Sequence, residues 1–499
     1  MNIAMLLEMA ADGMAERVAI GPAQGGTTYA GLLDDARRLA GLLHASGAER
    51  LVLVDVNSDI VPTLLFGAAL AGIPFAPVNY RLADDQLAAL LERTAPALAV
   101  VEAAVPGRVG KIGGIEYVGA AELRARLADT EPAPGDFVDP DSIGVLLFTS
   151  GTTGEPKAAV LRHRHLTSYV LSTVEFMGAE PEHAGLVSVP PYHVAGMATI
   201  LTALYGGRRL LYLPAFDPGA WVDLAREESV THAMVVPTML GRILDVLEER
   251  SESLPSLLHL AYGGGRMPVP VIERALRLLP HVGLVNAYGL TETSSTVSIL
   301  GPDDHRAAFA SHDPAVRARL GSVGRPLPSL EIEIRDPYGK PLPAGERGEI
   351  FVRGEQVAGE YLGKGGVLTE DGWFPTNDGG WLDHGGYLFV EGRLDDVIVR
   401  GGENISPGEV EDVLLEHPAV AEAGVVGVPD DEWGETVAAA VVLKAGAGVS
   451  ADELAEWVRG HLRSARTPTR IEFRDALPYN ETGKLLRRVL KAEMAVRTA

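Results

Sequence analysis

The pattern that most constrains the fold is an alternation of short apolar runs with longer helical stretches, beginning near residue 50. Such alternation is typical of α/β proteins, in which helices connect the parallel strands of a sheet. Strands are expected at 51–54, 97–101, 143–148, 186–189 and 233–236, and helices at 60–71 and 268–279. Residues 131–141, rich in proline and acidic side chains, are expected to form a linker or a long loop.

A domain boundary is expected near residues 392–396. The remaining residues, about 105, are enough for a small domain. Capping boxes at 406–409 and 450–453 each predict the start of a helix there. Strands are expected at 423–428 and 437–443. For a chain of 499 residues, the sequence therefore predicts an α/β large lobe over 1–394. This lobe would have several subdomains with parallel-type sheets flanked by helices, and a small mobile α+β domain would follow over 395–499.

Charge and composition exclude several classes of function. The chain has 43 basic and 67 acidic residues and a net charge of −24, which argues against nucleic acid or an anionic membrane as its main partner. The absence of cysteine excludes disulfides, thiolate zinc sites and a cysteine nucleophile, and favours a reducing, cytoplasmic location. Acidic residues near the start argue against an export signal, and prolines interrupt the uncharged stretch 60–80, so no membrane span is expected.

The most informative segment directly follows the strand expected at 143–148. It reads Thr149, Ser150, Gly151, Thr152, Thr153, Gly154, Glu155, Pro156 and Lys157. Glycines let the backbone turn its N–H groups inward, hydroxyls add donors and the lysine adds a positive charge, which together favour a phosphate cradle. It is not a Walker loop, because Glu155 and Pro156 separate the second glycine from the lysine.

This segment resembles the phosphate loop of the adenylate-forming enzymes, which include acyl-CoA synthetases, adenylation domains of peptide synthetases and firefly-type luciferases. The family's loop ordinarily ends Pro-Lys-Gly, and Ala158 stands here in place of the last glycine. The resemblance continues in order along nearly the whole chain. It implies ATP and Mg²⁺ as ligands and coenzyme A as a co-substrate.

Two further segments resemble the family's nucleotide motifs. In 286–292 the resemblance implies that Tyr288 stacks on adenine, that Thr291 meets the α-phosphate and that Glu292 helps to hold magnesium. Residues 263–268 resemble the glycine turn beside adenine. The nucleotide-binding residues implied by these two segments are Gly263, Gly264, Gly265, Asn286, Ala287, Tyr288, Gly289 and Thr291.

The segment 376–380 resembles the family's Thr-Gly-Asp motif. It implies that Asp378 accepts both ribose hydroxyls, although Asn377 and Gly379 depart from the usual residues beside it. Arg393 would also reach the ribose. Asp395 matches the hinge position, and the loop implied for the thioester step contains Gly401, Gly402 and Glu403.

Residues 480–484 resemble the family's terminal lysine motif. Lys484 is one of only seven lysines, against 36 arginines, and the resemblance implies that it contacts the carboxylate and the α-phosphate during adenylate formation. Rotation about Asp395 would then exchange Lys484 for the loop at Gly401 and Gly402.

The pair Tyr192–His193 resembles the aromatic–histidine pair of acyl-CoA synthetases, in which the histidine lines the acyl channel. No aspartate that could bind an amino group occurs over 188–204. Ala287 offers no cation for a second carboxylate, which favours a fatty or bulky hydrophobic monocarboxylic acid. His163 and His165 lack further ligands and are interpreted as a helix start. The acyl-pocket residues expected are His193, Val194, Gly196, Met197, Pro237 and Thr238.

The sequence therefore predicts an acyl-CoA synthetase that makes an acyl-adenylate and then a CoA thioester. Transfer to a separate carrier protein is an alternative, as are a non-catalytic nucleotide- or acyl-binding relative and a luciferase-like oxygenase. The predicted partners are a small carboxylic acid, ATP and CoA; a homodimer and peripheral membrane association stay open. The candidate catalytic residues are His193, Thr291, Glu292 and Lys484.

Overall fold

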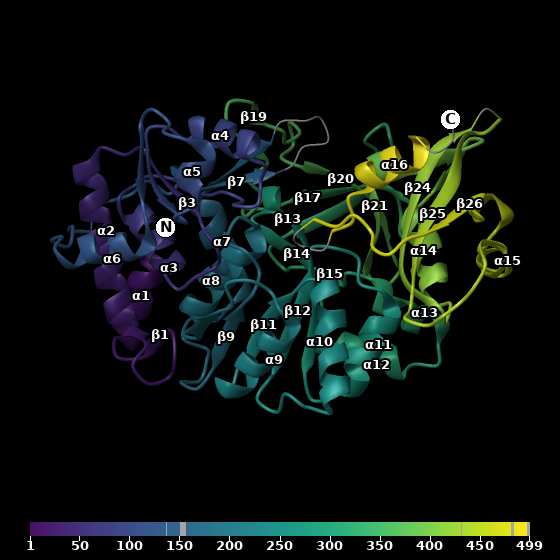
Figure 1. The fold of residues 1–499 in the computed structure, drawn as a ribbon, viewed down its shortest axis with the longest axis horizontal. Coiled ribbons are helices and arrows are strands. Elements are labelled where there is room, and N and C mark those ends of the chain that lie inside the picture. The colour runs from purple at the N-terminus through teal and green to yellow at the C-terminus, as the bar shows by residue number, and fades with distance from the viewer. Residues whose placement is uncertain (136, 150–155, 431, 481–483, 497–499) are drawn as a thin grey trace.

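The structure is a computed structural model that describes residues 1–135, 137–149, 156–430, 432–480 and 484–496. It is a mixed α/β fold with a large N-terminal domain and a smaller C-terminal domain, which confirms the predicted fold class (Figure 1). The small domain, light green to yellow, lies at the opposite end of the molecule from the purple N-terminal helices.

The first sheet of the large domain has eight strands. In spatial order they are β19 (Gly365–Gly366), β18 (Glu360–Tyr361), β8 (Lys157–Arg162), β7 (Ile143–Thr149), β4 (Phe75–Pro77), β3 (Arg50–Val54), β5 (Ala97–Val101) and β6 (Ile115–Val118). The pairings from β6 to β7 are parallel, and β8, β18 and β19 extend the sheet antiparallel. The helices that connect its strands or follow β8 are α3 (Val61–Leu70), α4 (Asp84–Glu92), α5 (Val105–Val109), α6 (Ala120–Ala128) and α7 (His163–Thr173).

The second sheet has nine strands, and its central strands from β1 to β13 are parallel. In spatial order they are β15 (Arg325–Pro326), β14 (Ser295–Leu300), β13 (Gly283–Leu290), β12 (His259–Gly263), β11 (His232–Val235), β9 (Ala184–Val187), β10 (Arg209–Tyr212), β1 (Val18–Ile20) and β2 (Thr27–Thr28). Its helices are α8 (Val194–Gly206), α9 (Pro218–Glu227), α10 (Pro237–Arg250), α11 (Val269–Leu278), α12 (Pro302–Ala310) and α13 (Pro314–Arg317).

Helices α1 (Ala4–Met14), α2 (Tyr29–Ser46), α3 and α8 contribute to one apolar core together with strands of both sheets. Every residue of α3 is buried, which explains why this segment carries no charge. None of the helices in the described part of the chain has the length and apolarity that crossing a bilayer requires.

A four-stranded antiparallel sheet completes the large domain and leads into the small one through a 3₁₀ turn, Leu394–Asp396. Its strands are β16 (Glu331–Arg335), β17 (Gly348–Arg353), β20 (Phe374–Leu382) and β21 (Leu388–Arg393). The small domain contains β22 (Ile398–Arg400), β23 (Glu403–Ile405), β24 (Val420–Asp430), β25 (Gly434–Leu443) and β26 (Arg470–Phe473), with α14 (Pro407–Leu415), α15 (Ala451–His461) and α16 (Arg487–Val496).

The elements expected from the sequence are present with small shifts at their ends. The capping box predicted at 450–453 is confirmed, because Ser450 and Glu453 bond reciprocally at the start of α15. The one predicted at 406–409 is wrong. Ser406 Oγ instead donates to the carbonyl of Glu391 at 2.8 Å, and Glu409 binds Arg466 at 2.7 Å. Several strands were not predicted, among them β8, which separates the phosphate loop from the helix that begins at His163.

Candidate active site

The predicted site residues of the second sheet gather at its carboxyl edge. The neighbouring strands β9, β11, β12 and β13 are parallel, so the segments that leave them meet at one side of the sheet. The start of α8 follows β9, the start of α10 follows β11, and the glycine turn follows β12. Tyr288 lies near the end of β13. Topology alone thus brings together motifs that lie up to 100 residues apart in the sequence.

Asp378 is the centre of a polar cluster. Its side chain, only 10% exposed, accepts a 2.7 Å hydrogen bond from the Tyr288 hydroxyl and lies 3.2 Å from Nε of Arg393. Burial raises the pKa of Asp378, and Arg393, the Tyr288 hydrogen bond and Lys484 oppose that rise. Burial and the neighbouring Asp378 also raise the pKa of Tyr288. The cluster therefore offers a buried carboxylate whose charge is held by donors on two sides.

Strand pairing positions this cluster. Asp378 and Arg393 are direct partners across the antiparallel strands β20 and β21. Arg393 is fixed further by a 2.7 Å hydrogen bond from its guanidinium to the carbonyl of Thr376. Asn377, which lies between Thr376 and Asp378 in the sequence, has φ +58°. This is a left-handed conformation that asparagine tolerates better than most residues. Asparagine at position 377, where the family has glycine, therefore still allows this turn of the backbone.

Glu292 forms a second cluster with residues of the first sheet. It is 9% exposed, and its Oε1 accepts a 2.6 Å hydrogen bond from the hydroxyl of Tyr361 in β18. Nζ of Lys157 lies 5.3 Å from the centre of the Tyr361 ring, a cation–π distance. The predicted lysine of the phosphate loop and the predicted magnesium ligand thus both contact Tyr361. This tyrosine was not predicted as a site residue, because nothing in its local sequence marks it.

The ends of the phosphate loop are held by β7 and β8. Thr149 and Lys157 are partners across this antiparallel pair, and Arg93 donates to the carbonyl of Pro156 at 2.8 Å. The predicted residues Ser150, Gly151, Thr152, Thr153 and Gly154 lie outside the described part of the chain.

Two glycines of the nucleotide motifs are required by close backbone contacts. A Cβ on Gly263 would lie 2.3 Å from the carbonyl oxygen of Ala287, and one on Gly289 would lie 1.8 Å from that of Ser295. Gly264 has φ +78°, and Gly265 lies beside Pro237. Asn286 donates to the carbonyl of Ser322 at 3.1 Å, which anchors the middle of β13. These residues therefore shape the backbone around Tyr288, and Thr291 follows in the 3₁₀ turn that carries Glu292.

Lys484 approaches the Asp378 cluster from the small domain. Loss of water around its ammonium and the charge of Arg393 lower the pKa of Lys484, whereas Asp378 and Asp396 oppose the shift. Such interactions require the lysine to lie near both carboxylates. The residue as a whole is exposed. The backbone N–H of Lys484 donates to Oδ1 of Asn480 at 2.8 Å, which fixes where the lysine emerges.

The loop predicted for the thioester step makes its contacts inside the small domain. The N–H of Gly401 donates to the carbonyl of Trp433 at 2.9 Å, and Glu403 lies 3.8 Å from Arg466. Gly402, with φ +84°, completes the turn between β22 and β23. In this orientation of the small domain Lys484 interacts electrostatically with Asp378, whereas the loop at 401–403 contacts residues of its own domain.

The predicted acyl-pocket residues come from two helix starts at the same edge of the sheet. His193 caps α8, which begins at Val194, and Pro237 and Thr238 begin α10. Burial lowers the pKa of His193 to about 4, so its imidazole is neutral at pH 7. The Tyr192 ring lies 4.7 Å from it. Gly196 lies against the carbonyl of Pro190, and Met197 is fully buried in the core that α8 shares with α1, α2 and α3.

An ion pair of Arg266 joins the two domains and was not predicted. Arg266, directly after the glycine turn, forms an ion pair with Asp412 in α14 of the small domain. Burial raises the pKa of Asp412 to about 6, although Arg266 opposes the shift. Among the described residues, no three or more His, Asp or Glu side chains are grouped to hold a metal ion.

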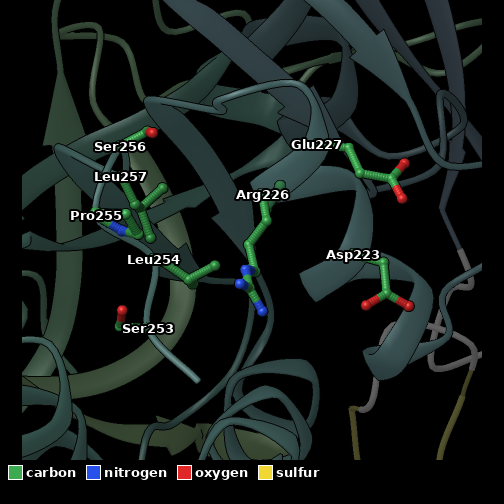
Figure 2. A pocket seen from close by; sticks show the side chains of 9 residues that line it. Asp223, Arg226, Glu227, Ser253, Leu254, Pro255, Ser256 and Leu257 are labelled. Carbon is green, nitrogen blue, oxygen red and sulfur yellow. The ribbon is translucent and has the colours of Figure 1, made fainter. Parts of the chain in front are cut away.

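A cavity of about 500 Å³ lies elsewhere, between α9 and the segment that follows α10 (Figure 2). Its lining consists of Asp223, Ala225, Arg226, Glu227, Ser253, Leu254, Pro255, Ser256 and Leu257. Figure 2 shows the side chain of Arg226 between the 253–257 segment and the carboxylate of Asp223. Arg226 is paired with Glu252, and none of the lining residues belongs to the predicted motifs.

Comparison with known proteins identifies the family of this chain. Residues 7–362 match the family described as "AMP-binding enzyme", and residues 409–484 match the family described as "AMP-binding enzyme C-terminal domain". Feruloyl-CoA synthase of an Amycolatopsis species is 36% identical over 481 residues, 93% of each chain. The fatty acid–acyl-carrier-protein ligase ScoC of Streptomyces coeruleorubidus is 33% identical over 488 residues, 93% of this chain and 91% of ScoC.

The solved structures include o-succinylbenzoate CoA synthetase (MenE) of Bacillus subtilis with its acyl-adenylate intermediate. It has a TM-score of 0.83 and 28% identity, with 97% of each chain covered. The same enzyme is known with ATP and a magnesium ion. The predicted class, an AMP-forming acid–thiol ligase that uses ATP and Mg²⁺, is thereby confirmed. The chain belongs to the AMP-binding enzyme family, the adenylate-forming enzymes.

Proposed function

We propose that the protein is an acyl-CoA synthetase that joins a hydrophobic monocarboxylic acid to coenzyme A through an acyl-adenylate. The observation that carries this proposal is a cluster of Asp378, Arg393 and Tyr288 in the large domain, with Lys484 of the small domain in electrostatic interaction with Asp378 and Arg393. An aromatic face, a carboxylate and two cations at one place suit a nucleotide and its phosphates.

In the first half-reaction, an oxygen of the substrate carboxylate attacks the α-phosphorus of ATP, and pyrophosphate leaves. Asp378 would accept hydrogen bonds from the ribose hydroxyls. Lys484 would stabilise the negative charge that redistributes between the substrate carboxylate and the α-phosphate. Glu292 fits Mg²⁺ because it is a buried hard-oxygen ligand with Tyr361 holding one of its two oxygens. A bound Mg²⁺ would neutralise charge on the phosphates.

In the second half-reaction, the CoA thiol attacks the carbonyl carbon of the acyl-adenylate, and AMP leaves. The chain has no cysteine, so the thiol comes from the co-substrate. We propose that the small domain begins at residue 395 and turns about Asp395 between the two steps. The turn would exchange Lys484 for the loop at Gly401, Gly402 and Glu403.

The proposed acid is a monocarboxylic, fatty or bulky hydrophobic one. Support comes from a neutral His193 beside an aromatic ring and from Ala287, which provides no cation for a second carboxylate. The relatives named above act on feruloyl, fatty acyl and succinylbenzoyl groups, so the choice between aryl and alkyl acids rests on the pocket itself. Transfer to a carrier protein is the second candidate, favoured by the likeness to ScoC.

A substrate panel tests the proposal. Fatty, aromatic and alicyclic acids and malonate are each supplied with Mg-ATP, and pyrophosphate release is measured without thiol, with CoA and with a phosphopantetheinylated carrier protein. We expect pyrophosphate with hydrophobic monocarboxylic acids and a CoA thioester of matching mass. If malonate is the best substrate, the proposed class of acid is wrong. If a thioester forms with the carrier protein alone, CoA is not the acceptor. If no acid yields pyrophosphate, the protein is not an acyl-adenylate-forming enzyme.

A further inference from the structure

The two consecutive carboxylates of the hinge are held by opposite domains. Oδ2 of Asp395 accepts a 2.9 Å hydrogen bond from the side-chain amide of Asn377 in β20. Oδ2 of Asp396 lies 3.7 Å from Nε of Arg487 in α16, and Arg487 also binds Glu411 of α14. The side chain of residue 395 is therefore held by the large domain, and that of residue 396 by the small domain.

The backbone at Asn377 does not by itself require an asparagine. Its φ of +58° is a conformation that glycine adopts without strain and that asparagine tolerates. The N–H of Asn377 donates to Oε1 of Glu349 at 3.0 Å, a bond that any residue other than proline could make. What the asparagine side chain adds is the hydrogen bond to Asp395.

Asn377 also lies directly beside the nucleotide cluster. The next residue, Asp378, pairs with Arg393, and a Cβ on Gly379 would lie 3.1 Å from Cδ2 of Leu394. One strand therefore supplies the carboxylate proposed for the ribose and, one residue earlier, the amide that holds the hinge. A change at either residue is transmitted through the same short stretch of backbone.

We propose that Asn377 is a positioning residue that holds Asp395 in the hinge conformation that brings Lys484 to Asp378, and so sets the ratio of the two domain orientations. This inference rests on the domain rotation in the proposed function. The inference requires that this rotation include φ of Asp395, because rotation about φ moves Cβ and the carboxylate relative to β20 and breaks the hydrogen bond to Asn377. Rotation about ψ alone would leave the hydrogen bond in place. A bond of this kind changes an equilibrium by about three- to tenfold.

The test uses Asn377→Gly, which suits the left-handed backbone and removes only the amide. Because the chain has no cysteine, E249C in α10 and E456C in α15 give one spin-label pair across the domains, both at exposed positions. The two domain orientations should give two label-to-label distances. We expect N377G to increase the population of the rotated orientation, relative to the orientation with Lys484 at Asp378, by about three- to tenfold. The matched control is S229G, which places glycine at an exposed residue of the large domain that also has positive φ, 51°.

A swapped pair, N377D together with D395N, keeps one hydrogen bond with donor and acceptor exchanged, and we expect it to restore the parent distribution. We also expect N377G to raise the rate of thioester formation from supplied acyl-adenylate relative to the rate of pyrophosphate release. An unchanged distance distribution in N377G, an equal change in S229G, or no restoration by the swapped pair overturns the inference. If no acid yields pyrophosphate, the proposed function fails, but the distance measurement still decides the role of Asn377.

Discussion

The hydroxyl of Tyr288 donates a 2.7 Å hydrogen bond to Oδ2 of Asp378, so the aromatic face proposed for adenine and the carboxylate proposed for the ribose are directly joined. Tyr288 lies in β13 of the nine-stranded sheet and Asp378 in β20 of the antiparallel sheet. The bond therefore fixes the relative position of two sheets at the point where a nucleoside would bridge them.

Replacing Tyr288 with phenylalanine keeps the ring and removes this bond. A hydrogen bond of this kind contributes about 1 kcal/mol, so we expect the KM for ATP to rise about fivefold while kcat changes little. Steady-state kinetics of pyrophosphate release measure both. Tyr387→Phe is the matched control, because the Tyr387 hydroxyl donates to Asp304 at 2.6 Å away from the motifs. An equal rise in Y387F would contradict a specific role for Tyr288.

The raised pKa of Asp378 predicts an acid limb in nucleotide binding. Ribose hydroxyls donate hydrogen bonds to the ionised carboxylate, so protonation of Asp378 weakens nucleotide binding. As the pH falls, this protonation begins at a higher pH than for an ordinary aspartate with pKa 3.8. Arg393 opposes the shift, so Arg393→Met should move the limb to still higher pH. The measurement is the Kd of AMP as a function of pH, with and without the substitution. A limb that moves to lower pH in R393M would contradict this assignment.

The same shift has a consequence for stability. A carboxyl with a raised pKa in the folded state contributes most to stability below its unfolded pKa, and that contribution is lost as the pH rises through the folded value. We therefore expect Asp378→Asn to raise the Tm at pH 7 while it weakens AMP binding. The gain in Tm should disappear below about pH 3.8. Calorimetry over pH 3 to 8 checks this, and a lower Tm of D378N at pH 7 refutes it.

Lys484 should separate the two half-reactions. Its charge is needed where the adenylate forms, so Lys484→Ala should abolish pyrophosphate release and leave thioester formation from supplied acyl-adenylate nearly intact. Because its pKa is lowered, pyrophosphate release should also decline with rising pH before the ordinary lysine value of 10.5 is reached. Lys491→Ala, which removes a surface ion pair with Glu435 at 2.7 Å, is the control. Equal loss of both half-reactions in K484A would contradict the proposed exchange.

The sequence predicted the parts of this site that depend on local residue order. Glycines at Gly263 and Gly289 mark places where strands approach too closely for a Cβ, and the order of hydroxyls, glycines and Lys157 marks the phosphate loop. The α/β fold followed from apolar runs that become buried strands, because burial on both faces leaves no room for polar residues.

Contacts between distant segments could not be predicted in this way. The bonds of Tyr361 to Glu292, Arg266 to Asp412 and Asn377 to Asp395 each join residues at least 18 positions apart, and local residue order does not specify such partners. The failed capping box at Ser406 has the same cause. Its hydroxyl has the correct spacing from Glu409, but the carbonyl of Glu391 and the side chain of Arg466 supply competing partners in the folded chain.

Tyr361 is expected to set the orientation of Glu292. Its hydroxyl holds Oε1 of Glu292, so Tyr361→Phe should leave Glu292 free to rotate and raise the Mg²⁺ concentration needed for half-maximal pyrophosphate release about fivefold, since a hydrogen bond to a carboxylate contributes about 1 kcal/mol or more. Glu292→Gln should have the larger effect, because it removes the charge itself. The ring of Tyr361 remains in Y361F, so its contact with Lys157 is kept and the KM for ATP at saturating Mg²⁺ should change less. A Mg²⁺ dependence of Y361F identical to that of the unmodified protein would show that Tyr361 does not orient Glu292.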